Sequence, residues 1–260
     1  MLPMSNGRTA GYRFFQSLVA DPRTVVDHWR GVPFFLRNLL AYRKLSNDEF
    51  PVTFGDLYYT SHERFAPAGS AKGHYFHQDL WAARNLYERG VRKHVDVGSR
   101  VDGFVAHVLP FCEVEYVDIR PLDVHVPGLK FRAGSIMSMP FDTDTVASLS
   151  SLHVLEHVGL GRYGDPIDPD GYRAGAAELT RVLARGGTLL LGTPVGRERL
   201  CFDAHRVFDP QRIVKLFEPL RLESFALVED GGNEVQSATL ESARKHEYAC
   251  GLFVFQKDRV

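Results

Sequence analysis

Two histidines and one glutamate lie within a single short stretch of the chain, Leu152–Val158, which reads LHVLEHV. His153, Glu156 and His157 stand at positions i, i+3 and i+4, so a helical backbone would place their side chains on one face. Imidazole takes up and releases protons near neutral pH, and a carboxylate beside it can orient the ring. These residue types at this spacing predict a general base, with His157 as a leading candidate and Glu156 as its orienter.

A fourth side chain, His205, lies further along the chain and can return to the same place, which makes it the second candidate base. The same set also suits a divalent metal ion, because imidazole and carboxylate groups are competent ligands. The candidate metal ligands are therefore His153, Glu156, His157 and His205. A third interpretation is that these side chains only pack beneath a bound ligand, and the residues leave all three open.

A second group of residues suits a nucleoside. The segment Val95–Gly103 reads VDVGSRVDG, and Tyr116–Ile119 reads YVDI. Gly98 allows a tight turn and a close approach of the backbone to a ligand. A helix over 102–109 would offer its N-terminal N–H groups to an anion such as a carboxylate. Asp118, at the end of the next strand, would accept the hydroxyls of a ribose.

The turn departs from the pattern that dinucleotides require. The pattern G-x-G-x-x-G brings the backbone against a pyrophosphate, but Arg100 and Asp102 stand here where such turns usually carry more glycine. The side chain of Arg100 would crowd the phosphates, so NAD is the weaker interpretation. The two residues either reshape the pocket beside the turn or mark a site that has decayed.

The elements that must position these residues follow from the apolar pattern. From Lys93 onward, short apolar runs alternate with stretches of helical spacing. Strands are predicted at 93–97, 114–118, 129–132, 145–150, 187–193, 222–229 and 249–256. Helices are predicted at 77–88, 102–109, 171–185 and 209–217. This alternation predicts an α/β fold, with a mostly parallel sheet covered on both faces. Its ligand should lie beyond the carboxyl ends of the strands, where the strand order reverses.

The chain before this alternation is of a different kind. Helical spacing runs through it, at Tyr12, Phe15, Leu18 and Val19 and then from Val25 to Tyr42. Pro22 and Pro33 interrupt the pattern, as a proline near a helix start would. Residues 51–75 are rich in Pro, Gly, Ser and aromatic residues, which predicts an ordered loop. We therefore predict a helical cap and loop over 1–73 and a main domain over 74–260.

Composition narrows the classes of function. The 260 residues carry a net charge of −1, so no basic excess favours nucleic acid as a partner. No run of about 18 apolar residues is present, so no membrane span is expected. The apolar stretch 34–44 ends in basic residues and is expected to pack on the main domain rather than on a membrane surface or a partner. Three cysteines without a C-x-x-C pair and no visible signal peptide predict buried thiols and a cytoplasmic protein.

Four segments decide which nucleoside is expected. They are AGSI at 133–136, MPF at 139–141, SSLHVLEHV at 150–158 and ELTRVLARGGTLLLGTP at 178–194. Together they resemble class I S-adenosylmethionine-dependent methyltransferases, over about residues 74 to 256. The resemblance implies a Rossmann-like fold with a seven-stranded sheet. The longer string LEHVGLGRYGDPIDPDG, from Leu155, further resembles an uncharacterised branch of methyltransferase-like proteins, which supplies a fold and no substrate.

The resemblance also assigns cofactor contacts. Asp96, Gly98 and Ser99 are similar to a methionine-binding turn, with Asp118 as the ribose acceptor. Further contacts fall on Tyr75, Gln78, Ile119, Gly134, Ser135, Ile136, Ser151 and Leu152. Ile119 and Ile136 would wall the adenine, while Ser135 stands where many relatives carry an Asp for the adenine amino group. Tyr75 and Gln78 would either touch the cofactor or seal the N-terminal helices to the sheet.

The function implied is methyl transfer from S-adenosylmethionine to a small polar acceptor, with a histidine base or a bound divalent metal. A hydroxyl on a sugar or glycan precursor is the expected acceptor, because the predicted mouth carries His and Asp side chains and the chain has no basic groove. Asp165, Asp168 and Asp170 would line a loop over that mouth or form a solvated turn. N-methylation and a cofactor-binding module without turnover are the alternatives.

Overall fold

The computed structural model describes residues 22–46, 50–235 and 237–259. Its contacts divide the chain into two compact units, Met1–Ser70 and Ala71–Val260, and each is described by itself. The helical spacing predicted for Tyr12–Val19 lies outside the described residues. The predicted role of the first unit as a cap on the second stays a prediction.

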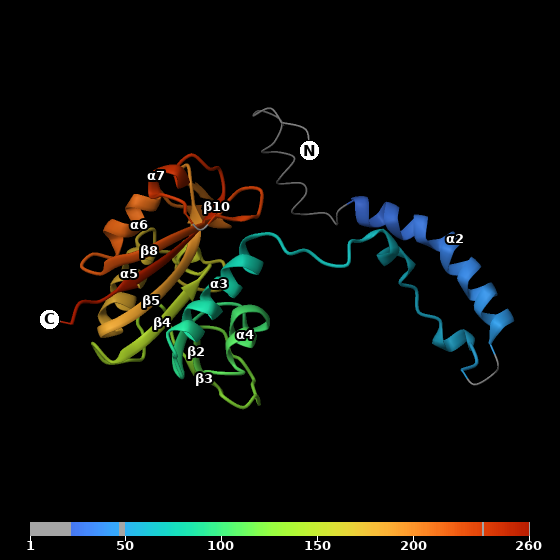
Figure 1. Ribbon diagram of the computed structural model, residues 1–260, viewed down its shortest axis with the longest axis horizontal. Helices are drawn as coiled ribbons and strands as arrows, with labels where there is room; N and C mark the ends of the chain where they lie inside the picture. The colour runs from blue at the N-terminus through green and yellow to red at the C-terminus, as the bar shows by residue number, and fades with distance from the viewer. Residues whose placement is uncertain (1–21, 47–49, 236, 260) are drawn as a thin grey trace. The chain divides into compact units, whose positions relative to one another are not determined.

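The first unit is built around one long helix, α2 (Pro22–Leu45), drawn in blue in Figure 1. The predicted interruption at Pro33 is wrong, because α2 continues through this proline and a helix can absorb one missing N–H donor. Arg30 lies over the ring of Phe65, 4.4 Å from its centroid. The segment 51–75, predicted to be an ordered loop, contains two short 3₁₀ helices, η1 (Phe54–Asp56) and η2 (Ser61–Phe65). No helix within the described ranges is long and apolar enough to span a bilayer.

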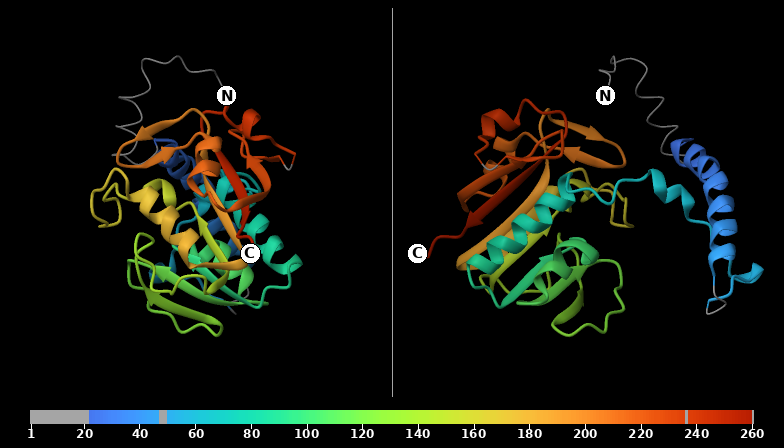
Figure 2. Two further views of the ribbon diagram at one scale, coloured as in Figure 1. Left: turned by 90° about the vertical axis from the view of Figure 1, so that its left-hand side faces the viewer. Right: turned by 45° about the vertical axis from the view of Figure 1, so that its right-hand side comes forward.

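The second unit is a mostly parallel sheet with helices on both faces (Figure 1, Figure 2). Eight strands lie in the order β3-β2-β1-β4-β5-β10-β8-β9. They are β1 (Lys93–Val97), β2 (Glu113–Asp118), β3 (Leu129–Ala133), β4 (Val146–Leu152), β5 (Leu183–Val195), β8 (Arg221–Val228), β9 (Glu234–Val235) and β10 (Ala249–Gln256). The seven predicted strands are confirmed, and the predicted total is corrected to eight because the short β9 adds an edge strand beside β8. A separate ribbon joins β6 (Arg199–Cys201) to β7 (His205–Val207).

The strand order reverses at β1. The chain passes outward from β1 to β2 and β3, and then crosses back to β4 on the other side of β1, with parallel pairing at every step. β5 extends the parallel run beyond β4, and β10 lies antiparallel between β5 and β8. The carboxyl ends of β1 and β4 therefore meet a switch point, which is where open α/β sheets bind ligands.

The helices are α3 (His74–Glu88), α4 (Ala106–Val108), α5 (Gly171–Val182), α6 (Pro210–Leu216) and α7 (Leu240–Ala243), with a five-residue π-helical turn, η3 (Val101–Val105), and a 3₁₀ turn, η4 (Leu155–His157). The helix predicted at 102–109 is thus one π turn with three α-helical residues. The helix predicted at 171–185 ends at Val182, because Leu183 is extended and pairs with Val146 at the start of β5.

Alternating side chains of the central strands supply two cores. On one face, Leu189 and Leu191 of β5 pack in a cluster with Leu179 of α5 and Ile213 of α6. Leu190, between them, points to the other face and packs in a cluster with residues of α3 and η3. This period of two, with apolar residues on both faces, is what a sheet buried on both sides requires. The rigid centre of the sheet fixes the strand ends that carry the candidate site.

Candidate functional site

A cleft of about 610 Å³, open to solvent, lies at the carboxyl ends of the strands. Its lining comes from the ends of β1 to β4 and the loops after them: Val97, Gly98, Val117, Asp118, Ile119, Arg120, Gly134, Ser135, Ile136, Met137, His153, Val154, His157, Val158, Tyr163 and Asp165. A second depression shares five of these residues, Gly98, Asp118, Arg120, His153 and Tyr163. The two depressions therefore form one groove across the switch point.

The glycine turn after β1 begins this groove. Gly98 has φ of +70°, and a Cβ built on it would lie 3.1 Å from a methyl carbon of Val154. Both the backbone angle and the space therefore require glycine. Beneath the turn, Asp96 accepts hydrogen bonds from the backbone N–H of Ser99 at 3.0 Å and from its hydroxyl at 2.6 Å. Asp96 is fully buried and does not line the groove, so it holds the shape of the turn.

A buried polar chain extends from Asp96 into the sheet. The hydroxyl of Ser150 donates to Asp96, and the two ring nitrogens of His94 lie 2.8 Å from the hydroxyls of Ser148 and Ser150. Burial raises the pKa of Asp96 to about 6, although the hydrogen bonds from Ser150 and Ser99 oppose this. Burial also lowers the pKa of His94 to about 3. His94 was not predicted from the sequence, because a single His in an apolar strand carries no local pattern.

Asp118 ends β2 and faces the groove, as predicted for a ribose acceptor. Its Oδ1 accepts from the backbone N–H and the Nε of Arg120, at 2.8 and 3.0 Å. Its Oδ2 accepts from Arg120 Nη2 at 2.7 Å and from the Tyr116 hydroxyl at 2.9 Å. Burial alone would raise the pKa of Asp118, but the hydrogen bonds from Arg120 and Tyr116 outweigh it and lower the pKa. The guanidinium of Arg120 also lies 4.5 Å over the ring of Tyr163.

The residues predicted to contact an adenine lie together at one end of the groove. Ile119, Gly134, Ser135 and Ile136 all line it. A Cβ on Gly134 would lie 2.9 Å from the ring of Pro140, so the chain passes there too closely for any side chain. The Ser135 hydroxyl accepts from the backbone N–H of Met137 at 3.2 Å. This wall is apolar with one hydroxyl, which suits the flat face of a base.

The predicted methionine end contains Tyr75, Ser99, Arg100 and Leu152. Arg100 pairs with Asp102 through bonds of 3.2 and 2.9 Å, and its guanidinium lies 5.0 Å over the ring of Tyr75. The two residues that depart from the glycine pattern therefore bind each other at the rim of the groove. Arg100 contributes a positive charge to this end of the groove.

Besides Asp96, two further predicted contact residues lie outside the groove. Gln78 is buried in α3, where its amide donates to Asp79 at 3.3 Å and its oxygen lies against Gly192. Ser151 is fully buried in β4. Neither lines the groove. Ser151 faces inward because successive residues of a strand point to opposite faces, and Gln78 lies on the face of α3 that is packed against the sheet.

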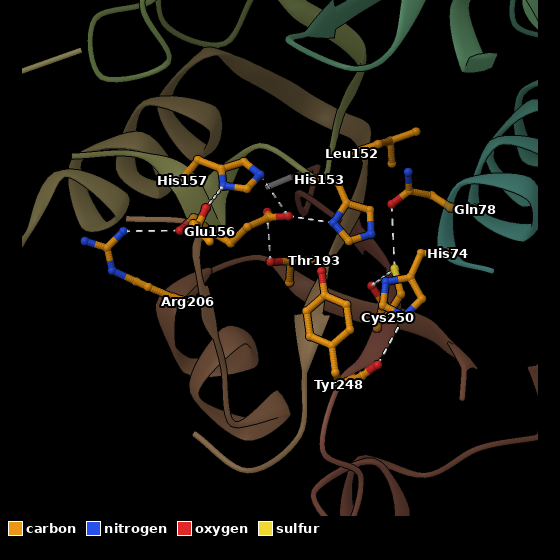
Figure 3. A network of polar contacts seen from close by, with 12 residues as sticks. His74, Gln78, Leu152, His153, Glu156, His157, Thr193, Arg206, Tyr248 and Cys250 are labelled. Carbon is orange, nitrogen blue, oxygen red and sulfur yellow. Dashed lines mark hydrogen bonds and ion pairs between the residues drawn. The ribbon is translucent and has the colours of Figure 1, made fainter. Parts of the chain in front are cut away.

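The histidine and glutamate segment does not form one helical face. His153 has φ of +57°, in the left-handed region, and only Leu155–His157 form a 3₁₀ turn. The prediction of a shared helical face is therefore wrong. His153 Nδ1 donates to Glu156 Oε1 at 2.6 Å, while His157 Nε2 lies 3.6 Å from the same oxygen (Figure 3). Glu156 is fully buried and also accepts from the Thr193 hydroxyl at 3.3 Å.

The two candidate bases differ in position. His157 lines the groove, and its Nδ1 donates to the carbonyl of Ala204 at 2.6 Å, which leaves Nε2 to accept a proton. His205 does not line the groove; its ring centroid lies 6.5 Å from that of His157 and 4.9 Å from that of Tyr248. Burial lowers the pKa of both histidines. At neutral pH both rings are therefore neutral and able to accept a proton.

The four predicted metal ligands do not gather around one point. The Nδ1 of His153 and the carboxylate of Glu156 bind each other, and the Nδ1 of His157 is bonded to Ala204. Asp165, in the predicted acidic cluster, lines the groove but accepts from the backbone N–H groups of Gly159 and Gly161 at 2.8 and 3.3 Å. Its carboxylate therefore holds the loop together.

Arg120 and Tyr163 were not identified from the sequence, although both line the groove. Arg120 stands two residues after Asp118, and Tyr163 lies in the GRYGDP part of the string that begins at Leu155. A basic residue two positions after a predicted ribose acceptor is the sequence pattern that could have indicated this contact.

Comparison with known proteins gives one family match and several similar solved structures. Residues 137–258 match a family described as Caenorhabditis protein of unknown function, DUF268. No curated protein matches the chain. The [4+2]-cyclase SpnF has a similar structure, with a TM-score of 0.52 and 12% identity over 69% of this chain and 81% of SpnF. The N-methyltransferase NodS from Bradyrhizobium japonicum WM9, solved with S-adenosyl-L-homocysteine, gives a TM-score of 0.49 and 15% identity over 71% of this chain and 88% of NodS.

The second unit has the Rossmann-like class I methyltransferase fold. The decisive feature is the strand order, in which the sheet reverses at β1 and the last strand is inserted antiparallel between β5 and β8. The likeness to SpnF concerns this fold alone, because a fold hosts more than one reaction.

Proposed function

We propose that the protein binds S-adenosylmethionine in the groove and transfers its methyl group to a small polar acceptor. The observation that carries this proposal is the position of Asp118. Its carboxylate lies at the end of β2, in the same cleft as the Gly98 turn and the apolar wall of Ile119 and Ile136. An adenosyl group needs three features: an acceptor for the ribose hydroxyls, a backbone that can approach the ligand closely, and an apolar wall for the base. The sequence resemblance to class I methyltransferases supports the same assignment.

The two ends of the groove would bind different parts of the cofactor. Ile119 and Ile136 would pack on the adenine, with the hydroxyl of Ser135 at its edge. At the other end, Arg100 and Ser99 would bind the carboxylate and amino group of the methionine part. The guanidinium of Arg100 is half exposed at this end and already paired with Asp102, so a carboxylate would form its charge-assisted hydrogen bond in competition with Asp102. Arg100 would thus take the place of the glycines that relatives carry.

The acceptor would be activated by His157. Methyl transfer from a sulfonium is an in-line displacement, so the protein mainly positions the acceptor and removes its proton when the acceptor is a hydroxyl. His157 Nε2 has no hydrogen bond among the described residues, and Glu156 lies 3.6 Å away to stabilise the imidazolium that forms. A sugar or glycan hydroxyl is the acceptor that we propose. An amine is the alternative acceptor, and it needs less help from a base.

The first test is calorimetric titration of the full-length protein with S-adenosylmethionine and S-adenosylhomocysteine. We expect both to bind, and Asp118→Ala to weaken both. Absence of binding by the unsubstituted protein at millimolar cofactor would overturn the proposal. Binding without methyl transfer to any hydroxyl or amine acceptor in a panel would instead favour a cofactor-binding module. Transfer to sugars, and its absence with amines, would support the acceptor class.

A further inference from the structure

Three side chains from distant parts of the chain converge beside the groove. His74 begins α3, His153 follows β4 and Cys250 lies near the start of β10. One donor atom from each lies within 4.8 Å of the other two. Figure 3 shows the ring of His153 with Glu156 on one side and with Cys250 and His74 on the other. This trio differs from the set predicted from the sequence, with which it shares only His153.

One ring nitrogen of His153, Nε2, is buried in the protein interior without a hydrogen-bond partner. A carboxylate only accepts hydrogen bonds, so the contact with Glu156 places the proton of the neutral imidazole on Nδ1. Nε2 then carries a lone pair, and this atom is buried without a hydrogen-bond partner. The side chain is 4% exposed, so water does not readily reach it. Buried polar atoms are almost always paired, and a bound ion is one of the causes that account for an unpaired one.

The other two side chains also have known hydrogen-bond partners. His74 Nε2 lies 3.2 Å from the backbone oxygen of Tyr248, which accepts a hydrogen bond from it and leaves Nδ1 of the neutral ring with a lone pair. Cys250 is fully buried, and its thiol donates a long hydrogen bond of 3.6 Å to Gln78 Oε1. The backbone of His153 holds the left-handed angle that directs its ring to this place. Such strain in a β-carbon-bearing residue persists where the surroundings impose it, and it occurs mainly at functional sites.

We propose that His74, His153 and Cys250 bind one Zn²⁺ ion. Two imidazole nitrogens and a thiolate are ligands that zinc prefers, whereas magnesium and calcium take oxygen. The hydrogen bond from His153 to Glu156 is the carboxylate–histidine arrangement that supports zinc ligands. Three protein ligands leave a fourth position open, as in zinc sites that act on a bound molecule. His74 is only partly buried and gives the ion a path to the site.

The competing interpretation is an ion pair without metal, in which the thiol of Cys250 gives its proton to His153. It accounts for two of the three side chains and leaves the lone pair of His74 unexplained. A Co²⁺ spectrum separates the two interpretations, because cobalt replaces zinc in the same ligands and reports on them directly. We expect a thiolate-to-cobalt charge-transfer band in the near ultraviolet and intense visible bands of a four-coordinate ion.

The test uses full-length protein purified without a histidine tag, and metal content is measured by mass spectrometry. We expect one zinc per chain, and loss of most of it in Cys250→Ser and in His74→Gln. The matched controls are Cys112→Ser, a second buried thiol, and His107→Gln, an exposed imidazole on α4; both should keep their zinc. Circular dichroism checks that every variant is folded.

Absence of zinc from the unsubstituted protein after reconstitution, or a cobalt spectrum without the thiolate band, would overturn the proposal. The cobalt spectrum needs no variant, so the proposal stays testable if Cys250→Ser does not fold. Neither measurement depends on S-adenosylmethionine. A protein that binds zinc but not the cofactor would therefore keep this inference and lose the proposed function.

Discussion

Arg120 binds both carboxylate oxygens of Asp118, with its Nε 3.0 Å from Oδ1 and its Nη2 2.7 Å from Oδ2. The carboxylate of Asp118 is 7% exposed, whereas the side chain of Arg120 is 52% exposed. The proposed ribose acceptor, Asp118, is thus a buried carboxylate, whereas the side chain of Arg120 that binds it is exposed at the rim of the groove. A ribose that donates hydrogen bonds to Asp118 must displace the guanidinium of Arg120.

The first prediction follows from this competition. Arg120→Ala frees Asp118, so S-adenosylhomocysteine should bind more tightly, by about 1 kcal/mol or less, the typical strength of a solvent-exposed ion pair. Asp118→Ala should weaken binding by about 1 to 3 kcal/mol, because the ribose hydroxyls lose their acceptor. Calorimetry at low and high salt measures both effects. Weaker binding by Arg120→Ala would show that the arginine holds the cofactor instead.

The second prediction concerns Gly98, and Gly90 provides a matched control. Both have left-handed backbone, with φ of +70° and +67°, but a Cβ on Gly90 would have no neighbour within 4 Å. Gly90→Ala should therefore lose only the strain of the backbone, about 1 kcal/mol. Gly98→Ala should lose more, because its Cβ also meets Val154, and it should weaken cofactor binding. Urea unfolding measures the stability, and equal losses in the two variants would contradict this account.

The elements that the sequence predicted share one property: each is long enough to show its period. Apolar runs such as 93–97 and 249–256 became β1 and β10. The short β6 and β9, of three and two residues, show no period and were missed. Pro33 was overestimated as a helix breaker, because α2 continues through it with the loss of one backbone hydrogen bond.

Some features of the candidate site could likewise be predicted from local sequence patterns, and others could not. The positions of the Gly98 turn and of Asp118 were predictable. Each lies at the carboxyl end of a strand, and that strand fixes its place in the sheet. The positive φ of His153 was not predictable, since no residue type near it demands a left-handed angle. The proximity of His153 to Cys250 depends on the pairing of β10 with β5. This pairing joins distant parts of the chain, and local sequence patterns do not encode it.

The third prediction concerns the pH dependence of stability. It uses two buried groups, His94 and Asp96, whose contributions to stability change in opposite directions with pH. His94 has a folded pKa of about 3, below its usual 6.5, so its contribution to stability is complete above pH 6.5 and is lost as pH falls toward 3. Asp96 has a folded pKa of about 6, above its usual 3.8, so its contribution is complete below pH 3.8 and is lost as pH rises through 6. The two effects oppose each other between pH 4 and 6.

Single substitutions should separate these effects. Between pH 7 and about 4.5, His94→Gln should gain stability relative to the unsubstituted protein, by about 3 kcal/mol, because one pKa unit corresponds to about 1.4 kcal/mol. Asp96→Asn should lose stability over the same interval, by about 2 kcal/mol. The free energy of unfolding in urea, measured at both pH values, gives the two differences. A shift of the same sign in both variants would contradict the assignment of opposite roles.

The fourth prediction concerns the base. His157 faces the carboxylate of Glu156 and the guanidinium of Arg162, which lies 3.3 Å from its Nδ1. Burial lowers this pKa, so the ring is neutral at pH 7 and loses its ability to accept a proton only on acidification. The methylation rate of a hydroxyl acceptor should therefore be constant near neutral pH and fall at a pH below 6.5. His157→Ala should remove this dependence and lower the rate by about 10²- to 10⁴-fold.

His205→Ala is the matched control for this variant, because His205 is also a half-buried imidazole with a lowered pKa but lies outside the groove. It should reduce the rate much less than His157→Ala does, and both variants should bind S-adenosylhomocysteine with unchanged affinity. A large loss in His205→Ala alone would transfer the role of base to that residue. Equal and small losses in both would mean that the acceptor needs no base, which is what an amine acceptor requires. The pair of variants therefore decides between O-methylation and N-methylation, because the two reactions differ in their need for a base whatever the rest of the acceptor looks like.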